Sequence, residues 1–210
     1  MRIRFSKTDT ACFISHLDLV RCMTRAFQRA GISVRRSQGY NPRPHIVFAA
    51  PLSLGIESTA ELMDVIVEQD LSPAEIMQRL NGGLPRDIRV SDVYEDGMPF
   101  RQISEARYIL KFPEQYARLF DSFVNADRIM TVKKTKHGPI QTDRKPYVNI
   151  ERFDIGPAGA DISLILPTGP DYNISMRVFL GAFFDSFEND EQIFYACRTD
   201  FFDKNGKLFR

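Results

Sequence analysis

The segment Ser37-Gln-Gly-Tyr-Asn-Pro-Arg-Pro-His45 separates a helix-like stretch of the chain from a strand-like one. Two prolines and one glycine in nine residues exclude both a helix interior and a central strand. Tyr40, Arg43 and His45 add an aromatic ring, a fixed cation and a group that titrates near neutral pH. We interpret the segment as a stiff loop that carries recognition or reactive side chains. The same residues also suit a tight connection whose prolines only shape the turn.

The residues before this loop predict a helix. Ser15, followed three residues later by Asp18, is typical of a capping box at a helix N-terminus, and Gly31 is a stop signal. Apolar residues recur between them at helical spacing and define a buried face: Leu19, Val20, Met23, Ala26, Phe27 and Ala30.

The residues after the loop predict a second helix between strands. Ser72-Pro73-Ala74-Glu75 forms another capping box, Ile76 and Leu80 give the helix an apolar face, and Asn81-Gly82-Gly83 is expected to stop it. The apolar patterns in this half predict strands at 2–6, 46–50, 62–68 and 88–94. The resulting order is βαββαβ, which is that of a ferredoxin-like unit.

The second half repeats this order after a polar boundary at 95–103 that contains Gly97 and Pro99. Its helices are expected to begin at Pro113 and at an Asn173 cap, and residues 147–153 form an extended excursion. Strands are expected at 107–112, 128–134, 161–166 and 193–202. We therefore expect an α+β protein of two tandem ferredoxin-like (βαββαβ) units with antiparallel sheets, at residues 1–96 and 104–210.

Composition narrows the class of protein. Hydrophobic residues make up 43% of the 210 residues, and no apolar run reaches the ~18 residues of a membrane span. The N-terminal residues lack a signal-peptide apolar block, so we expect a cytoplasmic protein without a membrane partner. The three cysteines show no Cys-x-x-Cys spacing, so neither a disulfide framework nor a zinc ribbon is indicated. No spacing supports a metal site from His16, Asp18 and His45, and no cofactor is predicted.

Charge is balanced over the chain but segregated along it. The net charge is +1, yet no acidic residue occurs between Leu19 and Ile56, where there are six arginines. Like charges four residues apart on one helix face repel by roughly 0.2–0.5 kcal/mol per pair, which favours an external anion. Salt bridges to acids near Glu61 or Asp64 are the alternative. The candidate RNA-binding residues of this region are Arg21, Arg25, Arg29, Arg35, Arg36, Tyr40, Asn41 and Arg43.

A second basic block runs from Lys133 to Lys145 around His137-Gly138-Pro139. A basic hairpin of this kind can lie along a phosphate backbone, although most charge runs are solvated loops. Its candidate RNA-binding residues are Lys133, Lys134 and Lys136.

The candidate catalytic residues are His16, Asp18 and His45. A histidine beside Ser15 and Asp18 suits acid–base chemistry. The competing interpretation is that Ser15 and Asp18 only cap the helix and that His16 is a surface residue of its first turn. The sequence contains no Walker loop, no Gly-x-Gly-x-x-Gly and no Gly-x-Ser-x-Gly.

A series of ordered motifs runs through roughly the first third of the chain. They are Phe5-Ser-Lys7, Phe13-Ile-Ser-His-Leu-Asp-Leu-Val-Arg21, Arg25-Ala26, Arg29-Ala-Gly31, Ser37-Gln-Gly-Tyr-Asn-Pro42, Phe48-Ala49, Pro51-Leu-Ser-Leu-Gly55 and Glu57-Ser58. In this order the motifs resemble the radical SAM-linked proteins of the bacterial DUF2344 family. Asp143-Arg-Lys-Pro-Tyr147 and Arg198-Thr199 also resemble later motifs of that family.

The resemblance implies a partner more than an activity. Its members accompany a radical SAM protein that has a cobalamin-binding-like domain, and this chain lacks the Cys-x-x-x-Cys-x-x-Cys of such enzymes. We therefore expect a non-catalytic partner or substrate-binding subunit of a radical SAM enzyme that engages RNA or another polyanion. The alternatives are an RNA-processing or RNA-modifying enzyme that uses His16 or His45, and a pure protein–protein adaptor.

Three positions depart from the family pattern. The family loop typically reads Asn-Pro-His-Pro-Lys, whereas Arg43 and His45 stand here in place of its histidine and lysine. Asp9 stands where the family often has glycine. A cationic binding role survives the loop exchange better than a proton-transfer role.

Overall fold

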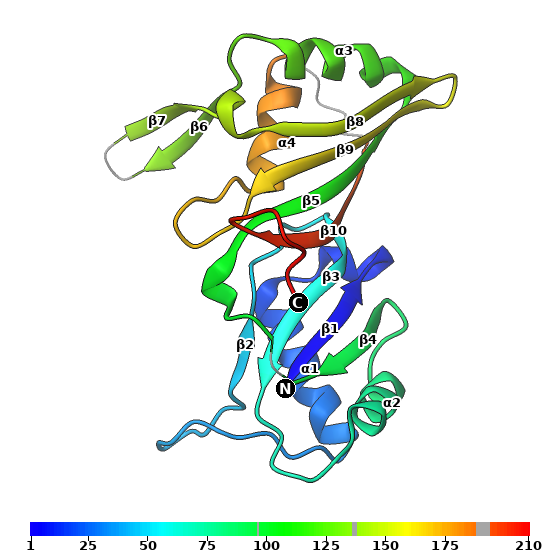
Figure 1. Cartoon of the computed structure of the whole chain (residues 1–210), viewed down its shortest axis with the longest axis vertical. Coiled ribbons are helices and arrows are strands. Elements are labelled where there is room, and N and C mark those ends of the chain that lie inside the picture. The colour runs from blue at the N-terminus through cyan, green and yellow to red at the C-terminus, as the bar shows by residue number, and fades with distance from the viewer. Residues whose placement is uncertain (96, 136–137, 188–193) are drawn as a thin grey trace. The chain divides into compact units, whose positions relative to one another are not determined.

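The computed structural model describes residues 1–95, 97–135, 138–187 and 194–210, and the chain divides into two compact units (Figure 1). The N-terminal unit comprises Met1–Gln102 together with Phe209–Arg210, and the C-terminal unit comprises Ile103–Leu208. The last two residues thus group with the first unit, whereas the expected second domain ran to 210. The physical reason is local, because Met98 N donates to the carbonyl oxygen of Arg210 at 2.9 Å and Phe209 lies 6.3 Å from the ring of Phe100.

Both units combine helices with antiparallel strands, so the protein is mixed α+β. The described residues contain four α-helices. None of these helices is long and apolar enough to cross a membrane.

The N-terminal unit has the strand order β4-β1-β3-β2, and every neighbouring pair is antiparallel. A 3-10 turn, η1 (Asp9–Phe13), leads into the first helix, and two helices connect the strands (Figure 1). In chain order these elements are β1 (Arg2–Lys7), α1 (His16–Arg29), β2 (Ile46–Phe48), β3 (Glu57–Val65), α2 (Pro73–Gly83) and β4 (Ile88–Tyr94).

The two faces of this sheet differ in what they bury. Ile3 pairs with Met63, and both belong to the core that α1 and α2 cover. Arg2 pairs with Asp64, and because side chains alternate along a strand, this pair lies on the opposite face. The helices contribute to the core Leu19, Met23, Ala26, Phe27, Ile76 and Leu80, all 4% exposed or less.

The ends of α1 follow the sequence signals. Ser15 is the N-cap, and its Oγ accepts from Asp18 N at 3.1 Å. The expected capping box is only half made, because Asp18 binds the Ser15 hydroxyl instead of the Ser15 backbone N–H. At the other end, Gly31 has φ +64, with Gly31 N bonded to Gln28 O and Ile32 N to Phe27 O. This is a Schellman motif, in which glycine is favoured.

Both ends of the second helix lie close to their sequence signals. The complete capping box of Ser72 and Glu75 confirms its start. The helix includes Asn81-Gly82-Gly83 in its last turn and ends at Gly83, the last residue of the expected stop signal. The Asn81 side chain bonds both Val90 N and Val90 O at 2.9 Å, which anchors this turn to β4 and compensates for the poor helix propensity of glycine.

The strand boundaries shift in the middle of the N-terminal unit. The expected strand at 62–68 begins earlier, as β3, at Glu57, and the strand expected at 46–50 ends at Phe48. Part of the loop expected at 51–58 is therefore strand. The start of β3 is polar, and its register with β1 shifts between Phe5 and Lys7, which local apolar patterns do not reveal.

The C-terminal unit has the strand order β10-β5-β9-β8, again with antiparallel neighbours. The 3-10 turn η3 (Lys145–Tyr147) precedes β8, and η2 (Phe100–Gln102), which belongs to the N-terminal unit, precedes β5. The elements are β5 (Ile103–Phe112), α3 (Glu114–Asn125), β6 (Met130–Thr135), β7 (Gly138–Asp143), β8 (Asn149–Gly156), β9 (Gly159–Pro167), α4 (Met176–Asp185) and β10 (Tyr195–Asp203).

Two expectations for this unit were wrong. The strand expected at 128–134 exists as β6, but it pairs only with β7 in a separate ribbon, and β8 takes its place in the sheet. The excursion is therefore the ribbon, not residues 147–153. Ser175, not Asn173, caps α4, because its Oγ accepts from Val178 N at 3.4 Å. Ile193, where the last strand was expected to begin, lies outside the described residues.

Candidate functional site

Residues 35–45 form an arm on the N-terminal unit, visible as the blue loop at the lower left of Figure 1. Arg35 N donates to Ile66 O and His45 N to Arg35 O, both at 2.8 Å, which fixes its base. Further out, Ser37 N donates to Arg43 O at 2.8 Å, and Arg43 N donates to Ser37 Oγ at 3.0 Å. The expected stiff loop is thus a hairpin-like arm with bonded legs.

The side chains of the arm are cationic, aromatic and exposed. Arg35, Arg36, Asn41 and Arg43 are exposed, and Tyr40 near the tip is fully exposed at 101%. The sequence of the arm contains no acidic residue. Glu68, near its base, lines a hollow of about 370 Å³ together with Arg36 and Pro44.

The three arginines of α1 do not share one role. Arg21 donates to Asp18 at 2.9 Å on its own helix. Arg29 donates through Nε and Nη2 to the carbonyl oxygen of Gly83, at 3.1 and 2.5 Å. Arg25 is exposed, and no partner for it is seen among the described residues. All three line a shallow hollow of about 410 Å³, in which Arg25 is the cation most available to an anion.

The salt bridges expected as the alternative do not involve Asp64. Its carboxylate accepts from Arg2 Nε and Nη2 at 2.8 and 2.9 Å, on the sheet face away from α1. Glu61 is only 4% exposed on β3.

The start of α1 resembles a helix cap more closely than an acid–base site, judging by the contacts of Ser15, His16 and Asp18. The Ser15 hydroxyl donates to Asp18 at 2.7 Å, and this bond together with the Arg21 contact lowers the pKa of Asp18. His16 packs edge-on against Phe48, with ring centroids 5.2 Å apart. The carboxylate is therefore engaged by Ser15 and Arg21, while the imidazole packs on β2.

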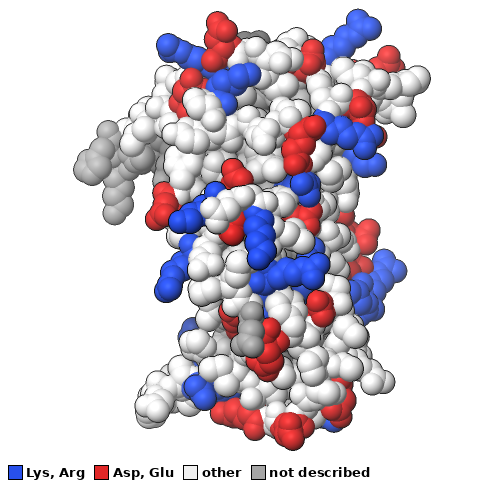
Figure 2. All heavy atoms as spheres, viewed as in Figure 1, with Lys and Arg blue, Asp and Glu red and all other residues white. Residues whose placement is uncertain are grey.

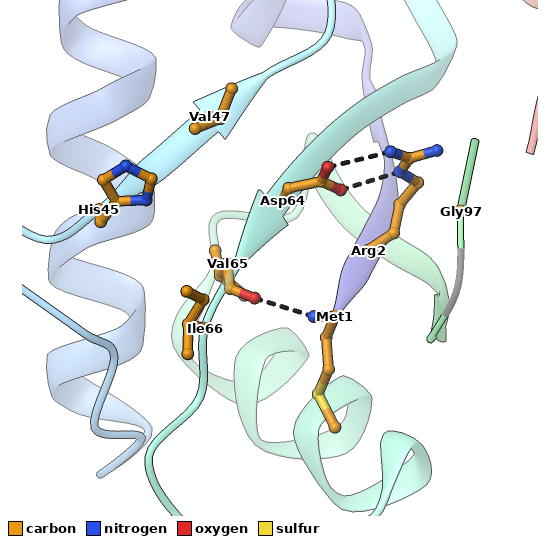
Figure 3. Close-up of a pocket in the computed structure, with 8 residues that line it drawn as sticks. All are labelled: Met1, Arg2, His45, Val47, Asp64, Val65, Ile66 and Gly97. Carbon is orange, nitrogen blue, oxygen red and sulfur yellow. Dashed lines mark hydrogen bonds and ion pairs between the residues drawn. The ribbon is translucent and has the colours of Figure 1, made fainter. Parts of the chain in front are cut away.

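His45 belongs to a different place. It lines a pocket of about 400 Å³ with Val47 from β2, Asp64 from β3 and Arg2 from β1 (Figure 3). These side chains lie on the sheet face opposite the helices, whereas Phe48, on which His16 packs, lies on the helix face. The two histidines are thus separated by the sheet, and no group of three metal-ligating side chains is found among the described residues.

The floor of this pocket contains an unusual arginine. Two nitrogens of Arg2 bind Asp64, and within the described chain the third, Nη1, has no hydrogen-bond partner. Figure 3 shows Nη1 pointing from Asp64 toward Gly97. The guanidinium also lies 4.2 Å from the ring centroid of Phe100. Because Arg2 is only 3% exposed, water contributes little to its contacts. The guanidinium is held mainly by the carboxylate of Asp64 and by the ring of Phe100.

The second basic block is only partly visible. Lys133 and Lys134 lie on β6 opposite Ile140 and Pro139, but their side chains, like Lys136 as a whole, lie outside what the structure describes. Arg144 donates to Thr131 Oγ1 at 3.0 Å, and the Lys145 ammonium donates to Val124 O. Arg144 and Lys145, the two cations of this block whose side chains are described, thus donate hydrogen bonds within the C-terminal unit.

Sequence reasoning missed an exposed apolar surface at the start of α1. Phe13 is 73% exposed, Leu17 66% and Leu54 48%. Phe13 lies against the segment of Leu54, because Gly55 N donates to Cys12 O at 3.0 Å and a Cβ on Gly55 would lie 3.9 Å from the Phe13 ring. The available signal was Leu17, an apolar residue outside the buried stripe of the helix.

Lys7 was also missed. It is 2% exposed at the end of β1, and its ammonium donates to the carbonyl oxygens of Cys12 and Ile14 at 3.4 and 3.1 Å. These contacts fix the chain immediately before Ser15. A lysine inside an alternating strand, on the face of Ile3 and Phe5, was the sequence signal.

Basic side chains do not dominate the surface in view. Figure 2 shows Lys and Arg interspersed with Asp and Glu, which agrees with a net charge of +1. The cationic features of the N-terminal unit are therefore local, namely the arm and the exposed side of α1.

The sequence was compared with models of known protein families and with curated proteins. A family model described as an uncharacterised protein conserved in bacteria, DUF2344, matches residues 1–174. No curated protein matches the sequence. The matched range contains the arm, α1, the pocket of His45 and the chain as far as β9. Because the match covers most of the chain, this protein belongs to the DUF2344 family.

Proposed function

We propose that the chain is a non-catalytic partner or substrate-binding subunit of a radical SAM enzyme, and that it engages RNA or another polyanion. The observation that carries the polyanion role is the arm, which exposes three arginines and one tyrosine on bonded legs without an acidic residue of its own. Arg25 on α1 adds a further exposed cation. Clustered cations of this kind favour phosphate, because each neutralised phosphate releases condensed counterions.

The partner in this proposal is a radical SAM protein with a cobalamin-binding-like domain. Support for it comes from the motifs that resemble radical SAM-linked proteins and from the exposed apolar surface of Phe13, Leu17 and Leu54. Exposed apolar side chains that lie together are typical of protein interaction sites. The same surface supports the adaptor alternative, in which the arginines meet acidic residues of the partner.

We also infer that both units are ferredoxin-like. Each has one antiparallel sheet in which the first and third strands are central, with the fourth strand beside the first and the second beside the third. If β5, β8, β9 and β10 are taken as the four strands of the C-terminal unit, the ribbon of β6 and β7 is an insertion between the first and second of them. Fold alone carries no activity, so this inference adds no weight to the RNA role.

The enzyme alternative has less support from the geometry. A general acid or base must reach the substrate within hydrogen-bond distance, and a paired carboxylate often orients a catalytic histidine. Asp18 is engaged by Ser15 and Arg21, and His45 lies on the other face of the sheet from His16.

RNA binding by the purified chain tests the proposal. We expect labelled total RNA to bind at about 50 mM salt and binding to weaken steeply toward about 200 mM, because counterion release gives log K a negative slope in log salt. Arg43→Ala and Arg25→Ala should each weaken binding. Arg118→Ala removes an exposed arginine of α3 and is the matched control. Absence of binding at the lower salt concentration would refute the RNA role.

The partner role needs a separate measurement. Co-purification with the radical SAM protein should depend on the apolar surface, so Leu17→Asp should abolish the complex while RNA affinity is retained. A complex that survives Leu17→Asp would place the interface elsewhere.

A further inference from the structure

Tyr40 is exposed in a way that tyrosines seldom are. Aromatic side chains usually bury 150–250 Å² and contribute much of the energy of cores and interfaces. Tyr40 buries none of its side chain, at 101% exposure. Its phenol ring is therefore available on both faces to a flat partner.

The arm presents this ring in an ordered way. The legs are tied by the reciprocal bonds between Ser37 and Arg43 and by a bridge between Arg36 and Pro44. Pro42 and Pro44 further restrict the returning leg. Because the legs are already folded, a ligand at the tip does not have to order them, which lowers the entropic cost of binding.

Cations flank the ring along the arm. Arg43 lies three residues after Tyr40, and Arg35 and Arg36 lie on the opposite leg. The combination of an exposed aromatic ring with a track of arginines is what single-stranded nucleic acids require, since bases stack on the ring and phosphates meet the cations.

We propose that the arm binds an unpaired segment of RNA, with Tyr40 stacked on one base and Arg43 contacting a neighbouring phosphate. This inference rests on the proposed polyanion role and adds that the RNA segment bound by the arm is unpaired. Bases in an A-form duplex are covered on both faces by their neighbours, and its deep, narrow major groove does not admit side chains. A ring at the tip of an arm can therefore stack only on a base that is unpaired or terminal.

The experiment compares two RNAs of the same sequence by fluorescence anisotropy with the full-length protein. One is an unpaired oligonucleotide, and the other is annealed to its complement. We expect the unpaired RNA to bind more tightly at equal salt. Tyr40→Ala should weaken that binding by at least about fivefold, given the stacking energies found for single bases. Tyr40→Phe, which keeps the ring, should restore most of the loss.

The salt dependence separates stacking from charge. Arg43→Ala should reduce the slope of log K against log salt by about 0.7, the value for one phosphate contact on a single strand. Tyr40→Ala should weaken binding without changing this slope. Because Tyr40 makes no buried contact, its variants should show the circular dichroism and melting curve of the wild type.

Four results would overturn the inference, and they have different meanings. Equal affinity for paired and unpaired RNA, or binding unaffected by Tyr40→Ala, would refute the stacking role while the polyanion role stands. Failure of both RNAs to bind would refute the RNA role as well. Tyr40-dependent binding of polyglutamate in place of RNA would assign the arm to an acidic protein surface.

Discussion

Arg29 near the end of α1 donates two hydrogen bonds, at 3.1 and 2.5 Å, to the carbonyl oxygen of Gly83 at the end of α2. The last carbonyls of a helix have no intrahelical partner, and the helix dipole places partial negative charge there. The guanidinium therefore satisfies an acceptor of α2 and ties the two helices together. One of the three regularly spaced arginines of α1 is thus structural.

This contact predicts that Arg29→Ala lowers the stability of the protein and that Arg25→Ala does not. Arg29→Ala should lower the free energy of unfolding by about 1 kcal/mol, the net value of a typical hydrogen bond. Arg25→Ala should leave stability unchanged, because Arg25 is exposed and no hydrogen-bond or ion-pair partner for it is seen among the described residues. Urea titration of both variants measures the difference. Equal stability of the two would mean that the Gly83 contact contributes nothing in solution.

The cap of α1 gives a second prediction. Ser15→Ala removes the acceptor for Asp18 N and should lower stability by about 0.5–2 kcal/mol. For a chain of this size that corresponds to roughly 2–4 °C in Tm per kcal/mol. Asp18→Asn should cost less, because an amide oxygen still accepts from the Ser15 hydroxyl. Loss of function in Asp18→Asn with a normal melting curve would instead assign Asp18 a functional role.

Asp18 also predicts a pH dependence. Its pKa in the folded chain is lowered, first by the Ser15 hydroxyl and then by Arg21. A carboxyl with a depressed folded pKa stabilises the fold above its unfolded pKa of about 3.9. This contribution is lost as pH falls through the folded value. The difference in stability between wild type and Asp18→Asn should therefore be constant near neutral pH and shrink below about pH 4. A difference that grows on acidification would contradict this assignment.

The sequence predicted the elements whose signals are local. Ser72 with Glu75, and Gly31, act within one helical turn, so capping chemistry alone located the start of α2 and the end of α1. The start of β3 at Glu57 depends on its pairing with β1, far earlier in the chain. β8 pairs with β9, the next strand along the chain, but whether β6 or β8 joins the sheet is decided by the tertiary structure. Local periodicity contains no information on either point, which explains why these assignments were wrong.

The candidate site divides in the same way. Arg36, Tyr40 and Arg43 are close in sequence, so their common placement on one arm followed from the sequence. The separation of His16 from His45 depends on strand alternation in β2, and the role of Arg29 depends on where α2 ends. Neither is visible in the spacing of the residues themselves.

Gly31, which follows the C-terminal end of α1, gives a prediction about backbone strain. Its φ of +64 lies in the left-handed region, and no atom lies within 4 Å of the position that a Cβ would occupy. Gly31→Ala should therefore cost about 1–2 kcal/mol from backbone strain alone. Gly31→Asn should cost less, because asparagine tolerates this conformation better. Equal costs for the two variants, measured by urea titration, would show that something other than backbone strain is responsible.

The close approach of Gly97 to Arg2 gives the last prediction. A Cβ on Gly97 would collide with Nη1 and Cζ of Arg2. That guanidinium cannot easily move, because Asp64 holds it through two hydrogen bonds and Phe100 stacks on it. Gly97→Ala should therefore destabilise the protein by about 1–3 kcal/mol, the usual range for overpacking.

A double-mutant cycle with Arg2→Ala identifies the cause. If the collision with the guanidinium is responsible, Gly97→Ala should cost little once Arg2 is truncated, and the two changes should be strongly non-additive. Arg4→Ala, on the same strand and the same sheet face, is the control background and should leave the cost of Gly97→Ala unchanged. Equal costs of Gly97→Ala in the wild-type and Arg2→Ala backgrounds would contradict this explanation. They would show that glycine is required at position 97 for its backbone conformation and not for the space that the Arg2 guanidinium occupies.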